Sequence, residues 1–147
     1  MRTFLSALLA SAALACANSK QPAEPNEGEP QPKVVPTNAE FTLRRGESAS
    51  VGGGMLIVTF LAVENDSRCP VDVVCVWGGD AELHFRLASE KSEAAAIVDT
   101  LHTGVEPRAA TYLGYTVTVN GLQPYPHSSD EPGSRDYRVA LVVTTEG

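Results

Sequence analysis

Hydrophobic and polar residues alternate with a period of two in three stretches of the chain. The stretch AELHFRL, residues 81–87, puts four apolar residues on one face and Glu82, His84 and Arg86 on the other. The stretches YTVTV, residues 115–119, and YRVALVV, residues 137–143, alternate in the same way. Because successive side chains of a strand point to opposite faces, this pattern predicts strands with one buried face.

The rest of the pattern predicts an all-β domain. The stretch MLIVTFLAV, residues 55–63, is apolar at both parities and predicts a central strand covered on both faces. Glycines 52–54 predict a tight turn, and Asn120-Gly121 predicts a break. One helical turn is expected near residues 89–94. Seven or eight short strands predict an antiparallel β-sandwich of immunoglobulin-like architecture, with a small β-barrel as the alternative.

The start of the chain predicts export. Arg2 precedes an uncharged apolar run that is shorter than the roughly 20 residues of a membrane-spanning helix, which is typical of a signal peptide over residues 1–15. The residues ALAC, 13–16, resemble the lipobox of bacterial lipoproteins. That resemblance implies acylation of Cys16 and a lipid anchor, and Ala17 after it implies the outer membrane. The alternative is an ordinary signal peptidase site after Ala15.

Residues 16–37 predict an extended, disordered tether, because they are rich in proline and poor in bulky apolar residues. The alternative is a proline-rich ligand for a partner's aromatic groove. One domain follows, residues 38–147. Its eight basic and fifteen acidic residues leave a charge of −7, which argues against nucleic-acid binding and against electrostatic docking on anionic lipid. The tether holds five of the ten prolines, Pro22, Pro25, Pro30, Pro32 and Pro36.

The three cysteines are interpreted together. Acylation of Cys16 leaves the pair Cys69 and Cys75, which we expect to form a disulfide in an oxidising compartment. Five residues lie between them in strand-like sequence, whereas a thioredoxin-like redox centre has two at a helix start. We therefore expect the bond to shape a loop.

Metal binding and catalysis have weaker signals. Copper or zinc could be held by soft ligands, but their spacing is not that of a structural zinc site, and no metal or other cofactor is expected. The sequence contains no GxSxG, no HExxH and no phosphate-cradling glycine motif, so we expect a protein that is not an enzyme and assign no catalytic residue. The candidate soft ligands for copper or zinc are Cys69, Cys75, His84, His102 and His127.

Three residues mark a possible binding loop around the cysteine pair. Asp66 and Arg68 are expected to tie the loop down through a surface ion pair. Trp77 is expected to be a core or rim residue that packs on the disulfide, and the alternative is an aromatic contact for a glycan or peptide.

The stretch DSRCPVDVVCVWGGDAEL, residues 66–83, with residues 114–126 and 136–144, resembles a group of small bacterial secreted or lipoprotein domains. That group carries a D-S-R-C-P and C-x-W-x-G-x-A pattern. The resemblance implies a secreted β-domain and supplies no catalytic residue. The matching positions are Asp66, Ser67, Arg68, Cys69, Pro70, Cys75, Trp77, Gly79 and Ala81.

The expected function is a membrane-anchored, non-catalytic envelope domain that binds or scaffolds an envelope or extracellular protein or glycan. A periplasmic copper- or zinc-handling protein is one alternative. A protease inhibitor that presents residues 69–75 is the other.

Overall fold

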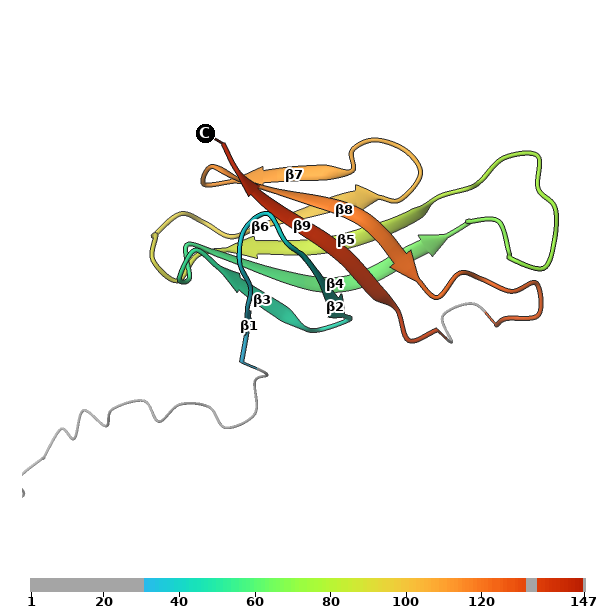
Figure 1. Ribbon diagram of the computed structural model, residues 1–147, viewed down its shortest axis with the longest axis horizontal. Coiled ribbons are helices and arrows are strands. Elements are labelled where there is room, and N and C mark those ends of the chain that lie inside the picture. The colour runs from blue at the N-terminus through green and yellow to red at the C-terminus, as the bar shows by residue number, and fades with distance from the viewer. Residues whose placement is uncertain (1–30, 132–134, 147) are drawn as a thin grey trace, which may run out of the picture.

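The computed structural model describes residues 31–131 and 135–146, and this part of the chain forms two packed sheets (Figure 1). One sheet has the order β1-β3-β4-β5-β6 and the other β2-β9-β8-β7. The sheets do not close into a barrel, so the predicted sandwich is confirmed. The strands are β1 (Lys33–Val34), β2 (Glu40–Arg44), β3 (Ser48–Val51), β4 (Leu56–Asp66), β5 (Ala81–Ala88), β6 (Ile97–His102), β7 (Ala109–Tyr112), β8 (Tyr115–Gln123) and β9 (Arg138–Thr145).

The alternating stretches form strands as predicted. In β5 the residues Ala81, Leu83, Phe85 and Leu87 are fully buried, and every second residue of β9 from Val139 to Val143 is buried in the same way. These inner faces meet in one core, where the rings of Phe60 and Phe85 stack 5.4 Å apart. Burial of one face of each strand against the other sheet is therefore the main stabilising contribution.

Strand β4 differs from the prediction that both of its faces are covered. Leu56, Val58 and Phe60 are fully buried on the inner face, and Ile57 is buried on the outer face, but Leu61 is 37% exposed. The pairing with β5 shifts register between Phe60 and Ala62, and again between Val63 and Asn65. An apolar run in the sequence does not show which part of the strand other residues cover. In β4 only the first half of the outer face is covered.

Two local predictions are wrong. Residues 89–94 form bends instead of a helical turn, because the Ser89 hydroxyl accepts hydrogen bonds from the N–H groups of Lys91 and Ser92 and competes with helix formation. Asn120-Gly121 does not break the chain. Strand β8 continues to Gln123 through a register shift between Val119 and Gly121, which is a β-bulge. Glycines 52–54 do form the predicted turn, all with positive φ.

The fold begins before the predicted boundary at residue 38. Strand β1 pairs in parallel with β3, and Val35 is buried in the core. Proline-rich composition did not reveal this pairing, because a two-residue edge strand needs only two free N–H groups. The predicted signal peptide, Cys16 and most of the tether lie outside the described residues. Within residues 31–131 and 135–146 no helix is long and apolar enough to cross a membrane.

Candidate functional site

The connection between β4 and β5, residues 67–80, is the candidate site, and we call it the CP loop. Its base continues the strand pairing: the Ser67 N–H donates to the Asp80 carbonyl at 2.7 Å, and the Cys69 N–H to the Gly78 carbonyl at 2.9 Å. Gly79 has φ +72°, and any side chain there would collide with the Ser67 carbonyl. The two arms of the loop can therefore come this close only with glycine at position 79.

The predicted disulfide between Cys69 and Cys75 is present, with the two Cα atoms 6.0 Å apart. It closes the outer half of the CP loop above the backbone pairing. Closing so short a loop removes about 2 kcal/mol of unfolded-chain entropy. The sulfurs hold the shape of the loop and are not free thiolates.

Arg68 anchors the CP loop from inside. It is only 4% exposed, and its guanidinium forms two 2.8 Å hydrogen bonds with the carboxylate of Asp66. It also donates to the carbonyls of Leu122 and Pro124 and lies over the ring of Tyr125, 4.5 Å from the centroid. The predicted ion pair between Asp66 and Arg68 is therefore present, but it is buried and not on the surface. The reason is tertiary, since the carbonyls that enclose Arg68 come from the end of β8, more than 50 residues away.

Asp66 is shared with a second arginine. Its carboxylate accepts hydrogen bonds from the Tyr137 hydroxyl at 2.9 Å and from Arg135 at 3.2 Å, and Arg135 also pairs with Asp130 at 2.8 Å. Burial alone raises the pKa of Asp66, but the hydrogen bonds and charge of Arg68 and the Tyr137 hydroxyl outweigh it and lower the pKa. Asp66 is therefore ionised at neutral pH and joins the end of β4, where the CP loop begins, to the segment just before β9.

The CP loop is tied to the connection that follows β8, and Figure 1 shows both at the same end of the sandwich. The Val71 N–H donates to the Pro126 carbonyl at 2.9 Å, and Asp72 accepts hydrogen bonds from the hydroxyl and N–H of Ser128. These two bonds lower the pKa of Asp72. The two connections therefore form one hydrogen-bonded unit.

Asp80 fixes the returning arm of the CP loop. One carboxylate oxygen accepts hydrogen bonds from the N–H groups of Thr103 and Gly104, and the other lies 2.6 Å from Nδ1 of His102. Burial raises the pKa of Asp80, but the Gly104 N–H and His102 outweigh it and lower the pKa. No motif marked this cluster, because its members are 22 to 24 residues apart in sequence.

The tip of the CP loop is apolar and exposed. Val74 and Val76 are fully exposed, and Trp77 is 65% exposed. Trp77 is therefore not in the core, which was one of the two positions, core or rim, predicted for it. Val71, Val73 and Tyr125 add exposed apolar surface next to it. Of the three predicted binding-loop residues, only Trp77 offers its side chain to a partner, because Asp66 and Arg68 are buried.

The three histidines are held on separate elements. His84 lies on β5, His102 is bonded to Asp80 at the end of β6, and His127 is in the connection after β8. The cysteines are consumed by the disulfide. In residues 31–131 and 135–146, no group of three or more His, Cys, Asp and Glu residues is close enough to hold a metal ion.

Comparisons with known proteins find no relative: no protein-family model, no curated protein and no solved structure matches this chain.

Proposed function

We propose that the chain is a membrane-anchored, non-catalytic domain of the bacterial cell envelope that binds an envelope or extracellular protein through the tip of the CP loop. The observation that carries this proposal is an uncharged tip, Val73 to Trp77, that stands in solvent on a base fixed by a disulfide and a buried arginine. Exposed apolar surface of this kind is typical of an interaction site.

The charges around the tip support an apolar contact. Asp72 is turned back onto Ser128, Asp80 is turned onto Thr103 and Gly104, and the Asp66–Arg68 pair is buried. Asp72 is exposed, but its carboxylate already accepts two hydrogen bonds from Ser128, and residues 73–77 carry no charge that a partner would have to desolvate. The partner needs an apolar groove that takes the valine and tryptophan side chains, and of these tryptophan is the residue type that most often anchors an interface.

The rigid base favours binding for a second reason. Association is opposed by the entropy lost when loops and side chains become ordered. Here the disulfide, the bond from Val71 to Pro126 and the Arg68 contacts order the backbone before any partner arrives. A preorganised tip keeps more of its contact energy as affinity.

The anchor is the second part of the proposal. Acylation of Cys16 would tether the domain, and an extended chain at about 3.1 Å per residue would place Lys33 up to about 50 Å from the lipid. Cys16→Ala should move the protein from the membrane fraction to the soluble fraction while leaving its thermal unfolding unchanged. Persistent membrane association of this variant would contradict the anchor.

Protease inhibition has less support than partner binding. An inhibitor that enters a protease cleft presents an extended segment, whereas here the Pro70 carbonyl accepts a hydrogen bond from the Val73 N–H and closes a turn.

Metal handling is tested by titrating copper and zinc into the oxidised protein. Tight stoichiometric binding that is lost in His84→Ala would favour that function instead.

Photo-crosslinking in the host tests the loop. A photoreactive residue at Val76 should give one discrete protein adduct, and the same residue at Val98, a 66% exposed valine of β6, should give none. Val74→Asp should abolish the adduct, because it would bury an unpaired charge in the partner's groove. Equal adducts from Val98, or adducts to lipid or glycan alone, would contradict a protein partner for this tip.

A further inference from the structure

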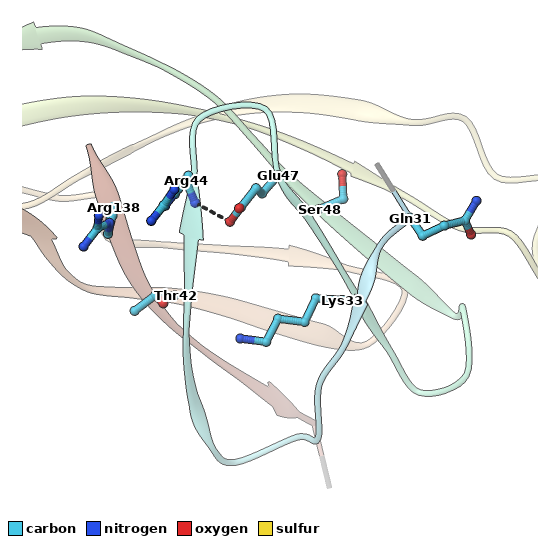
Figure 2. A pocket seen from close by; sticks show the side chains of 7 residues that line it. All are labelled: Gln31, Lys33, Thr42, Arg44, Glu47, Ser48 and Arg138. Carbon is cyan, nitrogen blue, oxygen red and sulfur yellow. Dashed lines mark hydrogen bonds between the residues drawn. The ribbon is translucent and has the colours of Figure 1, made fainter. Parts of the chain in front are cut away.

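A second candidate site lies at the open edge of the sandwich, away from the CP loop. Here β2, the edge of the four-stranded sheet, comes close to β1 and β3 of the other sheet and leaves a cleft of about 400 Å³ (Figure 2). The cleft is lined by Gln31, Lys33, Thr42, Arg44, Glu47, Ser48 and Arg138.

The cleft gathers positive charge in an acidic protein. Three of the chain's eleven lysines and arginines line it, while the whole chain carries −7. Arg44 and Arg138 are direct cross-strand partners of β2 and β9, so two like charges face the same side of the sheet. Such a pair is destabilising by itself, so a nearby anion would relieve a cost that the folded protein already carries.

The acidic residues near the cleft offset this charge only in part, because two carboxylates, those of Glu47 and Asp136, lie near three positive side chains. Glu47 lines the cleft, but its carboxylate accepts a hydrogen bond from the backbone N–H of Arg44 at 2.8 Å. Asp136 pairs with Arg138 at 3.5 Å, and both side chains are more than half exposed, so that pair is weak. Among residues 31–131 and 135–146, no carboxylate lies within ion-pair distance of the side chains of Lys33 or Arg44.

We propose that this cleft binds a phosphate group through Arg44 and Arg138. The planar fork of a guanidinium donates two parallel hydrogen bonds to phosphate oxygens, and two forks side by side match one tetrahedral group. In Figure 2 Lys33 extends from β1 toward β2, where its ammonium adds a third positive charge. Thr42, two residues before Arg44 on β2, also lines the cleft and adds a hydroxyl donor.

The volume of the cleft bears on the size of the ligand. A cleft of about 400 Å³ falls within the range of small-molecule sites, so it can take a group that carries phosphate as well as the free ion. Inorganic phosphate and a phospholipid headgroup present the same chemistry. They differ in whether binding requires a lipid surface, and two arms of one experiment separate them.

The first arm titrates inorganic phosphate into the Cys16→Ala protein and follows the phosphorus NMR signal. The second measures sedimentation of the same protein with vesicles of phosphatidylcholine alone or mixed with phosphatidylglycerol. We expect binding in at least one arm. The double variant R44Q/R138Q should weaken it about tenfold or more, because charge-assisted hydrogen bonds are lost.

Two further variants make the test specific. R45Q removes the same charge one residue along, at an exposed side chain that does not line the cleft, and should leave binding unchanged. E47Q keeps an oxygen acceptor for the Arg44 N–H but removes a negative charge from the cleft, so it should tighten binding. Thermal unfolding should show that R44Q/R138Q is at least as stable as the parent protein, since it removes a like-charge pair.

Binding to free phosphate assigns the ion or a soluble phosphate compound, and binding only to the mixed vesicles assigns a lipid headgroup. Absence of binding in both arms would overturn the proposal. An equal loss in R45Q would also overturn it, since that result means unspecific attraction to charge. Neither result bears on the CP loop, whose tip is at a different place in the fold.

Discussion

The two connections of the five-stranded sheet that flank β5 differ in what holds them and in what they expose. The CP loop, between β4 and β5, is fixed by a disulfide, by the buried Arg68 and by bonds to the connection after β8. The connection between β5 and β6, residues 89–96, is held by the hydroxyls of Ser89 and Ser92, by the Gly54 carbonyl and by the Tyr112 hydroxyl, without a disulfide or a buried charge.

The two connections also differ in the residues that they expose to solvent. Residues 90–96 expose two glutamates, a lysine and three alanines, as an ordinary solvated turn does. The CP loop exposes valines and a tryptophan on a rigid base. A connector needs only solubility and hydrogen bonds, so a disulfide and a buried arginine beneath an apolar tip indicate a surface that is kept in shape to meet another molecule.

The largest expected loss of stability comes from replacing Arg68, the buried anchor of the CP loop. Arg68→Met leaves the Asp66 carboxylate buried with only Arg135 and Tyr137 as side-chain partners, and should lower the free energy of unfolding by about 3 kcal/mol. Urea denaturation measures it. Arg86→Met on the exposed face of β5 is the control and should change stability by less than about 0.5 kcal/mol. Equal losses would mean that Arg68 is not the anchor of the loop.

Removal of the disulfide should have the next largest effect on stability. The double variant Cys69→Ser and Cys75→Ser should lower the free energy of unfolding by about 2 kcal/mol, because the unfolded chain regains the freedom of the closed loop. Reduction of the parent protein should have a similar effect, and reduction of the variant none. If the reduced loop keeps the parent's stability and its crosslinking at Val76, the backbone pairing alone shapes the tip.

Asp66 should make stability depend on pH. Its pKa is lower in the folded protein than the usual value of about 3.9, so its contribution is present above about pH 4 and is lost as the pH falls through the folded pKa. Urea denaturation of the parent and Asp66→Asn between neutral and acid pH should show a difference that shrinks with acidification. Asp72 and Asp80 remain in both proteins and cancel in this comparison. A difference in stability that stays the same at every pH would contradict the lowered pKa of Asp66.

The smallest effect on stability is expected at the tip itself. Trp77→Ala should change the free energy of unfolding by less than about 0.5 kcal/mol, because 65% of the side chain is already in solvent. The same variant should lose the Val76 crosslink. A loss of several kcal/mol would show instead that Trp77 supports the loop and would weaken the contrast with residues 89–96.

The sequence predicted the strands of the core better than their connections. Alternation identified β5, β8 and β9, since a period of two has one meaning when one face is buried. It failed at residues 89–94, where serine hydroxyls bond the backbone, and at Asn120-Gly121, where a bulge absorbs the residues that usually form a turn. Both outcomes depend on neighbours that a local pattern does not contain.

The candidate site shows the same division. The sequence by itself determined the pairing of Cys69 with Cys75, the glycines of the turns and the apolar composition of the tip, because these depend on residue type and short spacing. Only the tertiary structure decided that Arg68 is buried, that Trp77 is exposed and that Arg44 lies beside Arg138. Burial and charge proximity are set by which distant strands pair, and residues far apart in the chain carry no local mark of meeting.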